Sequence, residues 1–163
     1  MPITHRNSDQ FDRMYGEIPK AVDVHEHYAR VRIMHFSYTQ VGEGEPGSTI
    51  TIQRLPPGTV RLIRAQVAAS TSGEMHVTLG HQSYERVTGS VRETVSEQSD
   101  YCSNSGALTN IAVNGGLTFD QFGDESQLTT AFKSTQGVDL KLTSYGSIPD
   151  GTRIHGYILF GLD

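Results

Sequence analysis

Apolar and polar residues alternate with a period of two along most of the chain, which is the pattern of half-buried β-strands. The plainest case is residues 138–143, where Val138, Leu140 and Leu142 alternate with three polar residues. Turns rich in Gly, Pro and Ser separate such segments, so we expect about eight strands and almost no helix. The predicted strands cover residues 31–41, 49–55, 58–70, 75–81, 117–122, 127–133, 138–143 and 153–162.

Residues 58–81 form the centre of the predicted fold. A Pro-Pro-Gly corner at residues 56–58 starts one long strand, and a polar turn at residues 70–73 leads into a second. In the second strand, apolar Met75 and Val77 alternate with polar neighbours. Because this pair carries no obvious reactive group, we interpret it as the core scaffold.

The closing segment, residues 153–162, is apolar on both faces. Ile154 and Ile158 share one face, and Tyr157 and Leu159 share the other. Such a strand belongs inside a sheet, or has one face covered by a loop or a subunit. Together, the strands and turns predict an all-β fold, a jelly-roll-like β-sandwich of about eight strands with an extended N-terminal arm and one long loop.

The long loop spans residues 82–116, where no clear strand pattern runs. Within it, Ser90 and Glu93 fit a capping box, which predicts a short helix over residues 91–98. A loop of this length in a compact domain usually has a function or rests on a partner.

The first residues of the chain show no sustained periodicity. We therefore divide the chain into an extended arm, residues 1–23, and a β-sandwich domain, residues 24–163. An arm without a core of its own is either a flexible leader, packed on its own domain, or held by a partner. Its candidate partner-binding side chains are the apolar Phe11, Met14, Tyr15 and Ile18.

Composition narrows the functional classes. A chain of 163 residues with 17 Gly, no Trp and 36% hydrophobic residues fits one β-rich domain. The net charge of −5 and the scattered Lys and Arg argue against nucleic-acid binding. The sequence has neither an apolar run of about 18 residues nor the pattern of a signal peptide, so we expect a soluble, cytoplasmically made chain without a membrane partner. One Cys, Cys102, excludes an internal disulfide.

The residues that could carry chemistry are few. His25 and His27 would face the same way in a strand and could share a metal, but residues 28–32 supply no carboxylate at the offset that a cupin-like site needs. Cys102 has no basic neighbours that would lower the pKa of its thiol. Nucleophile-elbow and phosphate-loop motifs are absent. We therefore assign no catalytic, cofactor or metal site and expect a protein that is not an enzyme.

Two stretches, residues 55–84 and 137–163, resemble small virion structural proteins of tailed bacteriophages. The resemblance lies in a Leu-Pro-x-Gly corner before a long strand, a Leu-Gly-His-x-x-Tyr step after the next, and a closing strand with Gly-Tyr that follows Ile-Pro-x-Gly-Thr. It implies a jelly-roll-like sandwich in a phage particle. The head decoration or cement role is typical of proteins of this size, and they often form trimers.

The resemblance yields a main hypothesis and two alternatives. The chain is expected to be a homotrimeric capsid decoration protein that binds the major capsid protein on the outer surface of the virion, with no cofactor. The arm and nearby loops would make the contacts, and His81 and Tyr84, at the exit of the central strand pair, would join scaffold to contact surface. One alternative is a carbohydrate- or receptor-binding β-sandwich module of a phage tail or fibre. The other is a cupin-like metalloenzyme using His25 and His27.

Overall fold

The chain divides into two compact units, Met1–Arg30 and Val31–Asp163. The computed structural model describes a large part of the second unit and only Arg30 of the first. The arm side chains Phe11, Met14, Tyr15 and Ile18, the histidines His25 and His27, and Cys102 therefore lie outside the described residues, and the boundary at residue 23 stays a prediction. The described residues are 30–70, 75–101, 109–111, 116–120 and 131–162, with side chains described for 31–70, 75–101 and 131–162.

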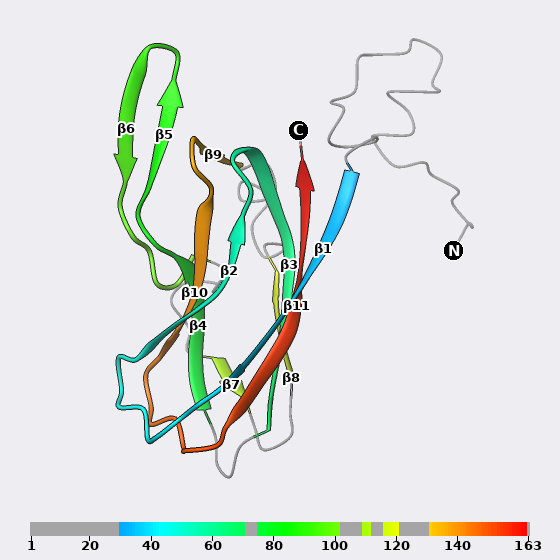
Figure 1. The fold of residues 1–163 in the computed structure, drawn as a ribbon, viewed down its shortest axis with the longest axis vertical. Coiled ribbons are helices and arrows are strands. Elements are labelled where there is room, and N and C mark those ends of the chain that lie inside the picture. The colour runs from blue at the N-terminus through cyan, green and yellow to red at the C-terminus, as the bar shows by residue number, and fades with distance from the viewer. Residues whose placement is uncertain (1–29, 71–74, 102–108, 112–115, 121–130, 163) are drawn as a thin grey trace, which may run out of the picture. The chain divides into compact units, whose positions relative to one another are not determined.

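Every regular element of the described residues is a strand (Figure 1), and none of these residues forms a helix able to cross a membrane. The eleven strands are β1 (Arg30–Thr39), β2 (Thr49–Leu55), β3 (Gly58–Ser70), β4 (Met75–His81), β5 (Tyr84–Thr88), β6 (Val91–Val95), β7 (Thr109–Ile111), β8 (Gly116–Asp120), β9 (Phe132–Ser134), β10 (Val138–Ser144) and β11 (Arg153–Leu162).

Nine of the eleven strands form two facing sheets. One has the order β1-β11-β3-β8, with the short β9 also paired to β3, and the other has the order β2-β10-β4-β7. When β5, β6 and β9 are left out, the remaining eight strands can be numbered 1 to 8 in chain order. One sheet then has the order 1-8-3-6, and the other has the order 2-7-4-5. This order is that of a jelly roll of two interlocked Greek keys. The predicted all-β, jelly-roll-like class is therefore confirmed. The long loop predicted over residues 82–116 is wrong in part, because β5, β6 and β7 lie within it.

The core lies between the inward faces of the two sheets, as the period-two pattern predicted. Ile50 and Ile52 of β2 are buried while their neighbours Thr49 and Thr51 are exposed. The two-faced strand β11 lies inside its sheet, between β1 and β3, as predicted. Ile154 and Ile158 on one face are buried, and Tyr157 and Leu159 on the other face are half-buried. Buried hydrophobic residues of both sheets join in one cluster.

A β-bulge changes the outward face of β3. In its pairing with β11, Arg64 lies opposite Leu159 and Leu62 lies opposite Phe160, so Ile63 is the extra residue. The bulge turns Arg61 and Arg64 to the same outer face, although they are three positions apart.

The predicted helix over residues 91–98 is wrong. The segment pairs with β5 as strand β6, and Gly89 closes the turn with a φ of 63°, a left-handed conformation that glycine adopts at little cost. Two residues, Gly89 and Ser90, separate the strands, which is a recognised hairpin signal. Cross-strand pairing, not a capping box, therefore accounts for Glu93, which binds Arg86 through two hydrogen bonds of 2.9 and 3.1 Å.

Candidate functional site

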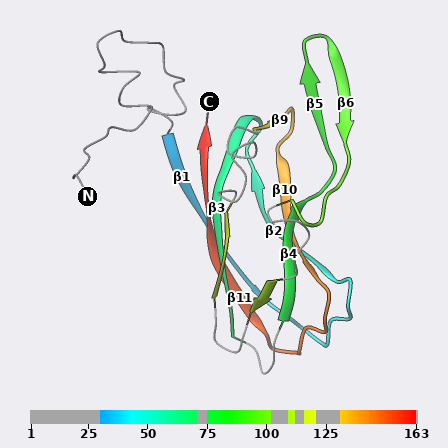
Figure 2. The ribbon, with the colours of Figure 1, turned by 180° about the vertical axis from the view of Figure 1, so that it is seen from behind.

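The hairpin β5–β6 starts and ends next to the C-terminal end of β4. His81 and Tyr84, the two candidate residues from the sequence at the exit of the central strand pair, lie at this position. In both views the hairpin extends beyond the end of β4 (Figure 1, Figure 2). It forms a separate two-stranded sheet, and most of its side chains are exposed. Because an isolated hairpin is marginally stable in water, the contacts at its base determine whether it keeps a fixed position.

A short strap, residues 97–99, follows the hairpin and crosses the outer face of β4. The backbone N–H of His81 donates to the Gln98 carbonyl (N···O 2.8 Å), and the N–H of Gln98 donates to the His81 carbonyl (3.1 Å). The Thr78 hydroxyl donates to the carbonyl of Ser99 (2.8 Å). The strap is therefore fastened to β4 by three hydrogen bonds.

Gly80 permits this close approach. A Cβ at Gly80 would lie 2.0 Å from the carbonyl oxygen of Gln98 and 2.6 Å from that of Ser99. Only a residue without a side chain fits beneath the strap.

The strap also buries a charge on β10. Lys141 lies opposite Gly80 in the sheet, and its side chain is 3% exposed. Its ammonium donates to the carboxylate of Glu97, which is 56% exposed. Alternation along β10 indicated that Lys141 lies on an outward polar face, but the strap covers this side chain. A buried ammonium needs a partner, so the ion pair ties the strap to β10.

Four aromatic rings fill the space inside the base of the hairpin. The ring of His81 contacts Tyr84, Tyr101 and Phe132 edge-on, with centroids 5.1–5.4 Å apart. The rings of Tyr84 and Tyr101 also contact Phe132, at 5.8 and 4.9 Å. Edge-to-face contacts add to burial because the ring edge is positive and the ring face is negative. Since Tyr84 starts the hairpin and Phe132 lies on β9, the cluster joins the hairpin to the core.

The environment of His81 favours a neutral ring. Its side chain is 2% exposed, and burial lowers its pKa, with the positive charge of Lys141 acting in the same direction. One ring nitrogen, Nδ1, lies 2.9 Å from the Gln82 carbonyl oxygen. Burial also raises the pKa of the Tyr84 hydroxyl. These groups stabilise the base of the hairpin, and a direct role of His81 and Tyr84 in partner contact stays a prediction.

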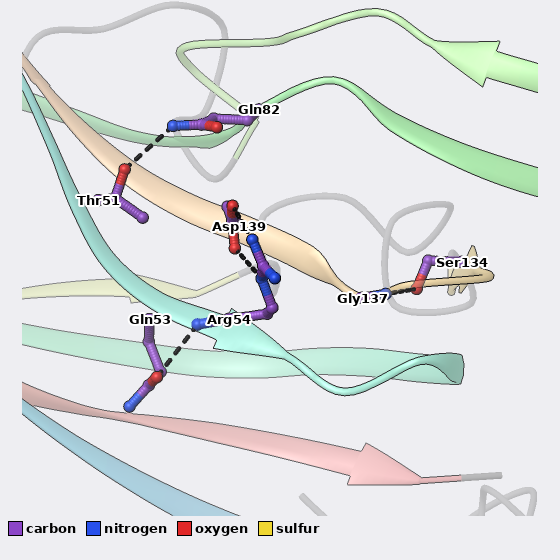
Figure 3. A network of polar contacts seen from close by, with 7 residues as sticks. All are labelled: Thr51, Gln53, Arg54, Gln82, Ser134, Gly137 and Asp139. Atoms are coloured by element: carbon purple, nitrogen blue, oxygen red, sulfur yellow. Dashed lines mark hydrogen bonds and ion pairs between the residues drawn. The ribbon is translucent and has the colours of Figure 1, made fainter.

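A groove of about 350 Å³ lies beside this base, between the hairpin and the β2–β10 edge. Figure 3 shows a polar network that includes three of the lining residues, and in it the Arg54 guanidinium binds the Asp139 carboxylate through bonds of 2.5 and 2.7 Å. This hydrogen-bonded pairing lowers the pKa of Asp139. The Gln82 amide donates to the hydroxyl of Thr51 (3.0 Å). The lining residues are Arg54, Ser83, Tyr84, Glu85, Thr94, Gln136, Gly137 and Asp139.

The described contacts at this site hold the hairpin in place. Among the described residues no three His, Cys, Asp or Glu side chains come together to hold a metal. In the groove, Arg54 and Asp139 bind each other, and His76 lies on the face of β4 opposite to that of His81. The arrangement fixes the hairpin as a projecting surface.

Sequence reasoning located this region but missed most of its members. His81 and Tyr84 stood out because they follow the last apolar position of β4. Glu97, Gln98 and Lys141 gave no signal, because their roles depend on the strap. The Gly-Ser dipeptide between two alternating segments is the signal that would have revealed the hairpin.

Comparison with known proteins supports the fold. No family model matches the chain, and no curated protein matches it in sequence. Among solved structures, a chain in the capsid of Ralstonia phage GP4 matches with a TM-score of 0.57 and 15% sequence identity, over 84% of this chain and 88% of that one. A chain in the capsid asymmetric unit of cyanophage Pam1 matches over the full length of both chains, with 10% identity and a TM-score of 0.45, too low to carry an argument. At these identities the likeness concerns the fold: this chain has a viral capsid-like jelly-roll β-sandwich.

Proposed function

We propose that this chain is a non-enzymatic structural protein of a tailed-phage capsid, which binds the major capsid protein on the outside of the head as a decoration or cement protein. The observation that carries the proposal is the jelly-roll fold shared with a chain of the Ralstonia phage GP4 capsid over 84% of this chain. The two stretches that resemble small phage virion proteins in sequence, residues 55–84 and 137–163, support it independently.

The hairpin β5–β6 is the element that we assign to capsid contact. Its tip carries Val87 and Val91, both exposed, on strands that pair only with each other within the described residues. Such edges can accept another strand, and apolar side chains at the tip add buried area. Because the strap and the aromatic cluster hold the base, binding would cost little additional ordering. The arm, residues 1–23, is the second proposed contact.

Co-sedimentation with capsids assembled from the major capsid protein of the same phage tests the proposal. We expect the wild-type chain to pellet with capsids and Val91→Asp to bind at least tenfold more weakly, because a carboxylate replaces an apolar contact. Thr49→Asp changes an exposed position on β2 and serves as the control. A chain lacking residues 1–23 should remain folded by circular dichroism and bind more weakly.

Absence of wild-type binding to capsids would refute the proposal. Equal binding by Val91→Asp and wild type would exclude the hairpin tip, and undiminished binding by the truncated chain would exclude the arm. The carbohydrate-binding alternative has four candidate platform residues, Tyr84, Tyr101, Tyr145 and Phe122. Tyr84 and Tyr101 pack in the aromatic cluster, Tyr145 is exposed, and Phe122 lies outside the described residues. No group of several exposed aromatic side chains among the described candidates therefore supports this alternative. A glycan array with specific hits and no capsid binding would reverse that preference.

A further inference from the structure

Among the described residues outside the hairpin, five large apolar side chains are exposed: Val31, Ile33, Tyr38, Val41 and Tyr145. Four of them, all except Tyr38, fall into two groups. The first lies on the outer face of β1, where Val31 is 58% exposed and Ile33 is 52% exposed. The second lies on the loops at the other end of the strands, where Val41 is 88% exposed and Tyr145 is also exposed. Exposed apolar side chains that lie next to each other, like Val31 and Ile33, are typical of interaction sites.

The first group lies in cationic surroundings. Ring contact between His35 and Tyr157 and a hydrogen bond from the Gln40 N–H to the Thr152 carbonyl set β1 against β11. This register brings Ile33 to the level of Leu159.

Beside Leu159, on the same outer face, lie Arg64 and Arg61, and Lys133 follows on β9. The strands β1, β3, β9 and β11 contain no Asp or Glu, and Asp120 of β8 lies opposite Arg64. We call this surface the basic face: Val31, Ile33, Leu159, Arg61, Arg64 and Lys133.

The second group lies in anionic surroundings. Residues 40–48 and 145–152 contain Glu43, Glu45 and Asp150 and no Lys or Arg. We call these two loops the acidic end. In Figure 1 they lie together at the lower end of the strands, while the start of β1 is at the upper end.

The acidic end has a fixed conformation. Gly44 and Ile148 exchange two backbone hydrogen bonds of 2.8 Å, and the Asp150 carboxylate accepts the N–H of Gly42 at 2.7 Å. The Gly47 N–H donates to the Ser144 carbonyl at 2.7 Å. Loops joined in this way lose little conformational entropy when a partner binds. They also keep the apolar side chain of Val41 exposed to water.

We propose that the partner of the basic face is a second copy of this chain, which docks its acidic end on that face. The two surfaces are opposite in charge, and each contains exposed apolar side chains. Two basic faces or two acidic ends would repel each other, so the contact joins different surfaces head to tail. Repeated contacts of this heterologous kind close into rings or extend into filaments. This inference concerns self-association and does not depend on capsid binding.

Charge exchange on the full-length chain tests the contact by sedimentation velocity. The face variant is Ile33→Glu with Lys133→Glu, and the end variant is Val41→Lys with Glu45→Lys; all four side chains are exposed. We expect wild type to self-associate reversibly and more weakly at high salt. Each variant alone should show at least a tenfold higher dissociation constant. An equimolar mixture should regain association, because each reversed surface meets its complement.

Matched controls place the same charge changes on the hairpin. Val87→Glu with Arg92→Glu and Val91→Lys with Glu85→Lys should associate like wild type. A monomeric wild type at all concentrations, a mixture that stays dissociated, or controls as weak as the test variants would overturn the proposal. Weakening by the face variant alone would also overturn it, because that result indicates a contact between two copies of one face.

Discussion

Replacement of Gly80 by alanine tests whether the strap fixes the hairpin. A Cβ at this position would lie 2.0 Å from the Gln98 carbonyl oxygen, where ordinary contacts begin near 3.4 Å. At Gly80, strand β4 pairs with β10, and on both sides of Gly80 the buried Leu79 and His81 pack on the core, so the backbone has little room to move away from the strap. We therefore expect the strap to lift from β4.

The hydrogen bonds that lifting breaks give a lower bound for the loss in unfolding free energy, because the ion pair between Lys141 and Glu97 is weakened as well. Two backbone hydrogen bonds join His81 to Gln98, and one joins the Thr78 hydroxyl to Ser99. At about 1 kcal/mol net for each bond, their loss costs about 3 kcal/mol. A domain of this size is commonly stable by about 5–15 kcal/mol, so Gly80→Ala should remain folded with a loosened hairpin.

Urea unfolding followed by circular dichroism measures this cost. The control is Gly146→Ala, where the nearest atom to the new Cβ is His76 Cδ2 at an ordinary 3.7 Å, and we expect a change of less than about 0.5 kcal/mol. Limited proteolysis should cut residues 82–99 faster in Gly80→Ala than in the control. Equal stability and equal cleavage of the two variants would refute the reasoning.

Three further predictions concern charged and titratable groups. Glu97→Gln leaves the buried Lys141 ammonium without its counter-charge and should cost about 1–2 kcal/mol in urea unfolding, whereas Lys141→Met should cost less than about 1 kcal/mol; equal losses would contradict this. Asp139→Asn should be less stable than wild type at pH 7, and the gap should close as the pH falls through the lowered pKa of Asp139 beside Arg54; a gap in thermal melts that persists at low pH would count against the ion pair. Burial lowers the pKa of His81, so below about pH 6.5 the imidazole is protonated in the unfolded chain and still neutral in the folded chain. The free energy of unfolding should therefore fall from pH 7 to pH 5, and His81→Phe should reduce that fall. The same dependence of stability on pH in His81→Phe and wild type would disprove this prediction.

The sequence predicted most strands of the two sheets, because a strand that is buried on one face has alternating apolar and polar residues in its own sequence. Alternation in residues 138–143 predicted β10, and two apolar faces in residues 153–162 placed β11 inside a sheet. The capping-box pattern at Ser90 predicted a helix over residues 91–98, and that prediction is wrong because the segment pairs with β5. The Gly89-Ser90 turn is a local signal that the capping-box interpretation overlooked.

The candidate site was predicted only in part. His81 and Tyr84 were singled out from the end of an apolar strand, and the structure places both at the base of the hairpin. The contact between Lys141 and Glu97 joins residues 44 positions apart. No local pattern encodes such a pair.

The sequence by itself determined the strand periodicity, the turns and the all-β class, because each depends on neighbours within a few residues. Only the tertiary structure decided which polar face is covered, since the strap that buries Lys141 is brought there by the hairpin's return. Tertiary structure likewise placed Val31 and Lys133 on one basic surface and gathered two distant loops into an acidic end. Surface charge patterns arise when separate strands come side by side, so they depend on the completed fold.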